Sequence, residues 1–81
     1  MTKNDFIKYI LERGDKSIQK LADESGVSRN NFYNWVANKS NPRHATINKL
    51  ANALGLEIKW IDENKIEILS DVGKIINKRV D

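Results

Sequence analysis

Apolar residues in the first two thirds of the chain recur every three or four positions, which is the period of an amphipathic α-helix. Four such sets occur: Phe6, Ile7, Ile10 and Leu11; Ile18, Leu21 and Ala22; Phe32, Trp35 and Val36; and Ile47, Leu50, Ala51 and Leu54. Residue types that favour helix ends bound each set. The expected N-caps are Asn4, Ser17 and Ser28, and the expected helix ends are Gly14, Gly26, Asn38 and Gly55. The pattern predicts four helices, the first spanning roughly Asp5 to Arg13.

After Gly55 the period of the apolar positions changes to two, which is typical of half-buried strands. Leu56, Ile58 and Trp60 alternate with charged residues, and a second alternating run follows the polar turn of residues 62–64. We expect a hairpin with a three-residue loop in which Asn64 is left-handed. The cross-strand pairs would be Ile61 with Lys65, Trp60 with Ile66, Lys59 with Glu67, and Ile58 with Ile68.

The chain has 81 residues, which allows one domain with a small core. We expect residues 1–55 to form a helical bundle and residues 56–81 to add the hairpin and a tail to the same domain, as a candidate dimerisation element. From Ser70 onward the tail carries a weak helical pattern that Gly73 interrupts. The predicted fold class is therefore mainly α with a C-terminal β-hairpin.

Positive charge is concentrated in one stretch of the chain. The whole sequence has 14 Lys and Arg against 11 Asp and Glu. Residues 25–56 contain Arg29, Lys39, Arg43 and Lys49 and no acidic residue, which leaves ten basic against eleven acidic residues elsewhere. An acid-free basic stretch on a helical pattern is the electrostatic signature expected of a phosphate-binding face.

Several functions are disfavoured by the residue types that are present. The chain has no cysteine and one histidine, His44, so we expect no disulfide, metal site or cofactor. No nucleophile–base pair and no Gly-rich phosphate loop is evident, so we expect no catalysis and identify no small-molecule substrate. No stretch approaches the roughly 20 apolar residues that span a bilayer, which favours a cytoplasmic protein without membrane contact.

The outward face of the third expected helix has an unusual composition. With Phe32 inward, a step of about 100° per residue places Asn30, Tyr33, Asn34 and Ala37 outward. Asparagine has poor helix propensity, so helix stability does not explain these amides. Amide side chains pair bidentately with adenine in the major groove, and arginine pairs with guanine. The simplest alternative is an ordinary polar helix face, which the acid-free charge makes the weaker interpretation.

The spacing around this helix follows a recognisable motif: Ala22, three residues, Gly26, five residues, Phe32, two residues and Trp35. Two helices that cross at roughly 90 to 120° through a short turn need a small residue at the contact and a glycine in the turn. Three segments carry the resemblance: Leu-Ala-Asp-Glu-Ser-Gly-Val-Ser-Arg from Leu21, Asn-Lys-Ser-Asn-Pro from Asn38, and Ile-Asn-Lys-Leu-Ala-Asn-Ala-Leu-Gly from Ile47. Over about Phe6 to Gly55 the chain resembles the Cro/CI-type (XRE-family) helix-turn-helix proteins.

This resemblance implies a lambda-repressor-like bundle of four to five helices that inserts a recognition helix into the major groove of double-stranded DNA, usually as a two-fold dimer. The residues that match base-reading positions are Ser28, Arg29, Asn30, Tyr33 and Asn34. Lys39 and Arg43 match phosphate contacts, and Asn41 and Ser28 are further candidates for holding the DNA backbone. Two positions depart from the family pattern: Ile18 stands where many relatives have a phosphate-bracing Gln, and Asn38 replaces the usual Gly.

The hairpin is a further difference from phage repressors and looks more like HigA-type antitoxins and some plasmid or phage regulators. An isolated hairpin is marginal in water, so it should pack on the bundle or pair with a second copy. The expected interface residues are Ile58, Trp60, Ile61, Ile66, Ile68 and Leu69. We predict a sequence-specific DNA-binding regulator that acts as a dimeric repressor. The alternative is an antitoxin-like interaction module that sequesters a toxin through the hairpin and tail.

Overall fold

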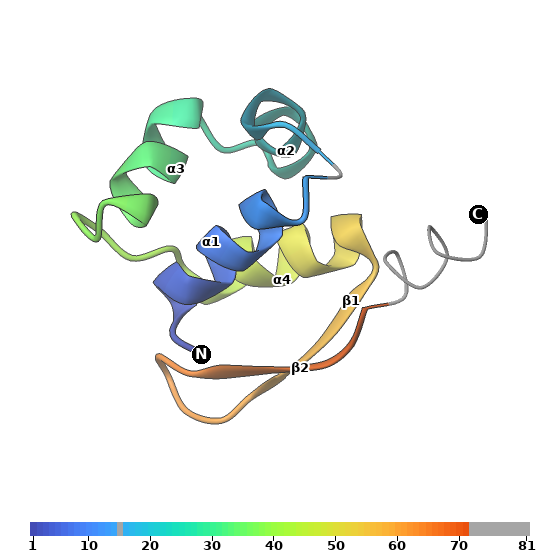
Figure 1. The fold of residues 1–81 in the computed structure, drawn as a ribbon. Coiled ribbons are helices and arrows are strands. Elements are labelled where there is room, and N and C mark those ends of the chain that lie inside the picture. The colour runs from blue at the N-terminus through green and yellow to red at the C-terminus, as the bar shows by residue number, and fades with distance from the viewer. Residues whose placement is uncertain (15, 72–81) are drawn as a thin grey trace.

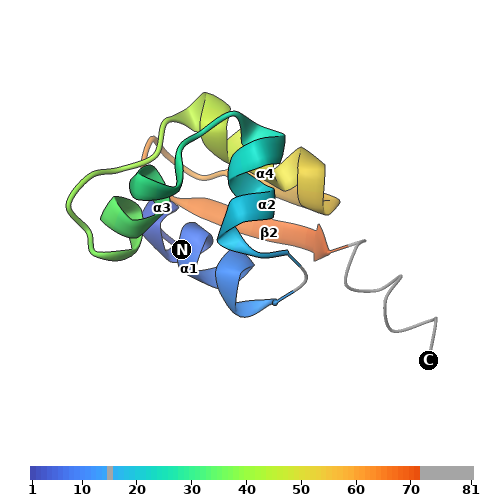
Figure 2. The same ribbon diagram turned by 90° about the horizontal axis from the view of Figure 1, so that it is seen from above.

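The computed structural model describes residues 1–14 and 16–71 of the chain. The elements are α1 (Lys3–Glu12), α2 (Ile18–Ser25), α3 (Arg29–Val36), α4 (His44–Leu54), β1 (Leu56–Trp60) and β2 (Ile66–Asp71). α1 and α4 lie in the middle, with α2 and α3 on one side and the hairpin of β1 and β2 on the other (Figure 1). In the view from above, α2 passes in front of β2 (Figure 2). The predicted mainly α bundle with a C-terminal hairpin is confirmed.

The first helix begins earlier than its apolar pattern predicts. Thr2 is the N-cap of α1, and its hydroxyl accepts a hydrogen bond from the Asp5 backbone N–H at 3.1 Å. The Asp5 carboxylate in turn accepts from the Thr2 N–H at 3.4 Å, which completes a capping box. The prediction that Asn4 caps this helix is wrong, because Asn4 lies inside α1 with its side chain buried. Ser17, by contrast, caps α2 as predicted.

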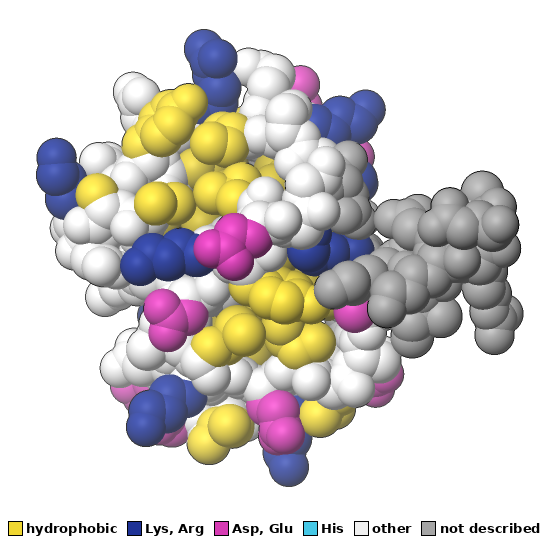
Figure 3. Space-filling view, viewed as in Figure 1, with side chains coloured by type: hydrophobic (Ala, Val, Ile, Leu, Met, Phe, Trp, Pro, Cys, Tyr) yellow, Lys and Arg dark blue, Asp and Glu magenta, His cyan; other side chains and the backbone are white. Residues whose placement is uncertain are grey.

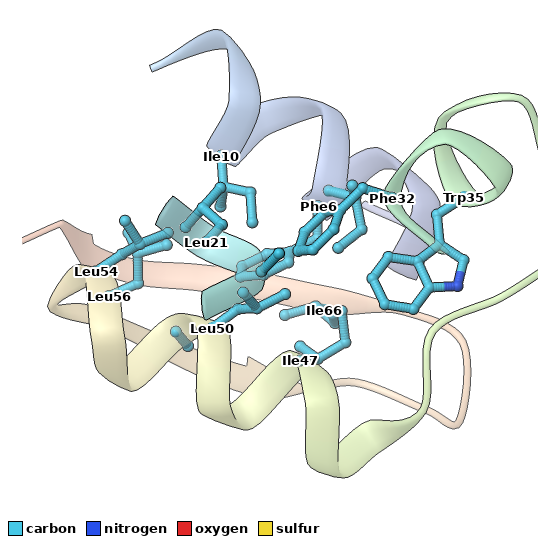
Figure 4. Close-up of a cluster of buried hydrophobic side chains, with 13 residues drawn as sticks. Phe6, Ile10, Leu21, Phe32, Trp35, Ile47, Leu50, Leu54, Leu56 and Ile66 are labelled. Carbon is cyan, nitrogen blue, oxygen red and sulfur yellow. The ribbon is translucent and has the colours of Figure 1, made fainter. Parts of the chain in front are cut away.

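One hydrophobic core joins all the helices to the hairpin (Figure 4). Its buried side chains are Phe6, Ile7, Ile10, Leu21, Ala22, Phe32, Trp35, Ile47, Leu50, Ala51, Leu54, Leu56 and Ile66. Each of the four predicted helical sets contributes to this list, so the helical period identified the inward faces correctly. Val36 is the exception, since it is 38 % exposed at the last residue of α3 while Trp35 makes the core contact of that turn.

The strand register of the hairpin agrees with the sequence pattern. The pairs Trp60–Ile66, Lys59–Glu67 and Ile58–Ile68 are confirmed. The predicted conformation of the turn is wrong, because Asn64 does not adopt a positive φ. Instead, the Asn64 backbone N–H donates to Asp62 Oδ1 at 2.8 Å. This side-chain hydrogen bond stabilises the turn without a left-handed residue.

The second strand continues further than predicted. Ser70 and Asp71 belong to β2, so the weak helix expected from Ser70 is wrong at its start, and the remainder of that helix lies outside the described residues. Leu69 is an extra residue in the ladder and forms a bulge. Asp71 pairs with the Arg13 guanidinium at 3.0 Å and accepts a hydrogen bond from the Tyr9 hydroxyl at 3.1 Å. These contacts anchor the end of β2 to α1.

The start of the chain extends the hairpin by pairing with the outer edge of β2. Ile66 N–H donates to Met1 O at 2.8 Å, and Met1 N donates to Ile66 O at 2.9 Å. Lys3 N–H donates to Asn64 O at 3.2 Å, and Thr2 forms a bridge with Lys65. The first turn of α1 is therefore fixed directly to the hairpin, a link that no periodic pattern in the sequence indicates.

Candidate nucleic-acid interface

The turn between α2 and α3 has the geometry that the spacing of small residues predicts. Gly26 ends α2 at φ 72°, a left-handed conformation in which a side chain is strained. Its N–H donates to Ala22 O at 2.9 Å, and the Val27 N–H donates to the same carbonyl at 3.2 Å. The buried Ala22 thus lies at the start of a tight reversal that aims α3 across α2.

Two aromatic rings hold the inward face of α3. Phe32 is fully buried and Trp35 nearly so. Their ring centroids are 5.1 Å apart with an interplanar angle of 66°, an edge-to-face arrangement that aromatic pairs prefer. Figure 4 shows both rings pointing into the core from α3. Because both rings are fixed there, the rotation of α3 about its own axis is fixed as well.

The opposite face of α3 is open to solvent. All five predicted base-reading residues are exposed: Ser28, Arg29, Asn30, Tyr33 and Asn34. Tyr33 is 57 % exposed, so its phenol is available to a ligand. Ser28 occupies the N-cap position of α3, but its side chain makes no capping hydrogen bond. The arrangement presents arginine, amides, a phenol and a hydroxyl together on one exposed surface.

The loop after α3 carries the predicted phosphate-contacting residues. Asn38 adopts φ 60°, the left-handed conformation expected of a residue that replaces glycine at this point. Lys39, Asn41 and Arg43 are all exposed. A polar hollow of about 390 Å³ lies between this loop and α3, and its lining residues are Val27, Asn31, Trp35, Ser40, Asn41, Arg43 and Thr46. On α3 the hollow is lined by Asn31 and Trp35, not by the base-reading side chains. The loop itself is joined to α3 by the Lys39 N–H, which donates to Asn34 O at 2.9 Å.

Basic charge dominates this part of the surface. Within residues 1–14 and 16–71 the recorded ion pairs join Arg13 to Asp71 and Lys16 to Glu24, so neither uses Arg29, Lys39 or Arg43. In the space-filling view, the surface over α3 and the following loop shows basic but no acidic side chains (Figure 3). Cations without carboxylate partners on such a face suit an anionic polymer.

Asn4 is a functional candidate that the sequence pattern did not identify. Its side-chain Nδ2 donates to Trp35 O at 2.8 Å and to Ser40 O at 2.9 Å. These bonds tie α1 to the end of α3 and to the following loop. The signal that could have found Asn4 is a polar residue among the apolar positions of α1, although its place before Phe6 predicts a helix cap instead.

His44 joins the start of α4 to the hairpin. It opens α4, and its ring stacks on that of Trp60 with centroids 3.9 Å apart. Its Nε2 lies 2.7 Å from Glu63 O. The ring is thus exposed to solvent on one side and packs against the hairpin on the other.

The residues of the expected protein interface fall into three groups. Ile61 and Leu69 are exposed on the outer face of the hairpin, at 58 % and 52 %. Ile58, Trp60 and Ile68 are half-buried against the core. Ile66 is fully buried in the core of its own chain, so its assignment to an interface is corrected.

Comparison with protein-family models decides the family. Residues 7–61, well over half of the chain, match the family model described as helix-turn-helix. The chain belongs to the helix-turn-helix family. The resemblance to Cro/CI-type (XRE-family) proteins and the predicted fold are confirmed by this match. Searches of curated proteins and of solved structures returned no significant match.

As a helix-turn-helix protein of the XRE type, the chain is a regulator that binds double-stranded DNA, and its family is generally non-enzymatic. Ile18, the residue that stands where many relatives have Gln, is half-buried against the core and offers no amide at that point. Among the described residues, no helix has the length and apolar character to cross a membrane, and no cluster of His, Asp or Glu is suited to a metal ion.

Proposed function

We propose that this helix-turn-helix protein is a dimeric repressor that reads a near-palindromic operator through α3. The observation that carries the proposal is the exposed face of α3, where Arg29, Asn30 and Asn34 stand opposite two buried rings. Amides and guanidinium groups on a helix that fits the major groove are the side chains that discriminate base edges. A repressor of this kind acts by occupying a promoter, which requires binding alone.

The mechanism follows from the neighbouring groups. Arg29, Asn30 and Asn34 read bases, and Tyr33 contacts a thymine methyl group or a phosphate. Lys39, Asn41 and Arg43 hold the DNA backbone, because their loop begins directly at the end of α3, where the Lys39 N–H donates to Asn34 O at 2.9 Å. Phosphate contacts fix the register of a helix in the groove, while base contacts supply the sequence preference.

Dimerisation would bring two such DNA-binding surfaces to one operator. Two recognition helices related by a two-fold axis enter successive major grooves about 34 Å apart, so half-sites should be centred roughly 10 bp apart. The outer face of the hairpin supports this step, because Ile61 and Leu69 are exposed apolar side chains that the bundle leaves uncovered.

The second candidate function is an antitoxin-like module that sequesters a protein toxin through the same hairpin face. It is favoured by the same two exposed apolar residues, Ile61 and Leu69. The two functions can coexist in one protein. A monomer in light scattering that ignores duplex DNA at low salt would favour the interaction module and would contradict the repressor.

The direct test is selection of bound sites from random duplexes, followed by titration of the selected site with variants. Asn34→Ala should relax preference at one base position, with a loss of about 1–3 kcal/mol in discrimination. Lys39→Ala should weaken all sequences alike and flatten the salt dependence. Matched controls are Asn52→Ala on α4 and Lys65→Ala near the hairpin tip, which are exposed residues away from α3. An Asn34→Ala protein with unchanged affinity and base preference contradicts the proposed docking.

A further inference from the structure

We propose that Asn4 is a positioning residue for DNA recognition. Its side-chain amide holds the end of α3 and the following loop in the relative geometry that lets one surface read bases and hold phosphates together. The inference rests on the proposed function, and it assigns a role to a residue that has no place on the DNA-facing surface.

The geometry of the amide is unambiguous. Asn4 is only 8 % exposed, and its Nδ2 carries two hydrogens that reach two carbonyl acceptors, Trp35 O at 2.8 Å and Ser40 O at 2.9 Å. Because carbonyl oxygens only accept hydrogen bonds, the NH₂ group and not the side-chain oxygen must face them. We call these two bonds the Asn4 clamp.

The clamp holds the two parts of the surface that must act together. Trp35 O lies in the last turn of α3, where it also accepts a hydrogen bond from the Asn38 N–H at 3.1 Å. Ser40 lies between Lys39 and Asn41 in the loop that supplies phosphate contacts. The left-handed residue Asn38, at φ 60°, is in the intervening segment. The Asn4 clamp therefore spans the chain reversal, with one hydrogen bond to the end of α3 and the other to the loop that contacts the DNA backbone.

Asn4 is also well anchored on its own side. The residues just before it pair with the hairpin, including the Lys3 N–H donated to Asn64 O at 3.2 Å. The comparison with Ser25 shows what is particular to Asn4. Ser25 is also buried, at 5 % exposed, but its hydroxyl bonds within its own helix, to Leu21 O at 2.7 Å. Asn4 instead joins α1 and the hairpin-linked start of the chain to the recognition element.

The test uses Asn4→Ala with Ser25→Ala as the matched control, since both remove one buried polar group. Titrations are done where circular dichroism shows each variant folded. Asn4→Ala should lower affinity for the selected duplex by about ten-fold or more, the size of one lost base contact. It should also flatten the salt dependence, because Lys39 and Arg43 lose their placement. Ser25→Ala should keep both the affinity and the salt dependence.

A readout without DNA separates positioning from general destabilisation. In Asn4→Ala, amide hydrogen exchange should accelerate in residues 37–43 and stay close to wild type in α2 and the hairpin. If Asn4→Ala does not fold, Asn4→Ser, which keeps a shorter hydroxyl donor, is measured in its place. Wild-type affinity, salt dependence and loop exchange in the folded variant would overturn the inference and leave the proposed function intact. A wild-type protein that binds no duplex would overturn both.

Discussion

The imidazole of His44 lies flat on the indole of Trp60, with ring centroids 3.9 Å apart and planes inclined by 20°. The indole N–H donates to Asn48 Oδ1 at 3.2 Å, and His44 Nε2 is 2.7 Å from Glu63 O. His44 directly follows Arg43, a candidate phosphate contact. The stack therefore connects the start of α4, beside the proposed DNA surface, to the hairpin that carries the proposed protein interface.

Replacing His44 by Ala should lower the free energy of unfolding by about 1 kcal/mol, because both the ring contact and the hydrogen bond to the hairpin are lost. Denaturant unfolding followed by circular dichroism measures this change. Lys49→Ala, also exposed on α4, is the control and should change stability little. Equal stability of His44→Ala and wild type would show that the stack does not hold the hairpin.

The ion pair between Arg13 and Asp71 should contribute more to the free energy of unfolding than the pair between Lys16 and Glu24. The side chains of Arg13 and Asp71 are only 3 % and 12 % exposed, against 26 % and 30 % for the other pair. Asp71→Ala should cost about 3 kcal/mol, since it leaves a buried guanidinium without its carboxylate. Replacing both residues by Leu should recover much of that loss, because no buried charge remains. Thermal unfolding of the single and double variants tests this non-additivity. Glu67→Ala on the exposed side of β2 is the control.

Asn38 provides a test of backbone strain after the recognition helix. Asn38 has φ 60°, a left-handed conformation that Asn and Gly tolerate better than Ala. Asn38→Ala should therefore destabilise the fold by about 1 kcal/mol, whereas Asn38→Gly should stay within about 0.5 kcal/mol of wild type. The neighbouring Ala37→Gly is the matched control, because Ala37 has φ −82° and gains nothing from glycine. Chemical denaturation gives the order of stabilities. Asn38→Ala as stable as wild type would mean that the loop adopts another conformation in solution.

What the sequence predicted correctly depends on local pattern. The inward faces of the helices follow from the period of Phe6, Leu21 and Ile47 and their companions, and the hairpin register follows from alternation on both sides of a short turn. The exposed face of α3 follows in the same way once Phe32 and Trp35 are placed inward. Each of these features depends on residues that lie close together in the sequence, so a single sequence suffices to find them.

What the sequence missed depends on contacts between distant segments. The partners of Asn4 lie 31 and 36 residues away, so its apparent capping role came from its position beside an apolar set. The actual cap, Thr2, forms a box with Asp5 in place of the more familiar Glu or Gln. Ile66 has the same alternating pattern as Ile68, and only the packed bundle shows which of them is fully buried.

The exposed hairpin residues give the sharpest test of dimerisation. Ile61→Lys and Leu69→Lys should each change monomer stability by less than about 0.5 kcal/mol, because both side chains are already exposed. Each should shift the protein from dimer to monomer in sedimentation analysis, since an unpaired charge would be buried in the interface. Affinity for the full operator should then fall while affinity for an isolated half-site is kept, because linked half-sites bind more tightly together than alone. Asn52→Lys, an exposed position on α4, should alter neither property. If the wild-type protein occupies its full operator as a monomer, or if both hairpin variants remain dimeric, the hairpin face is not the site of assembly.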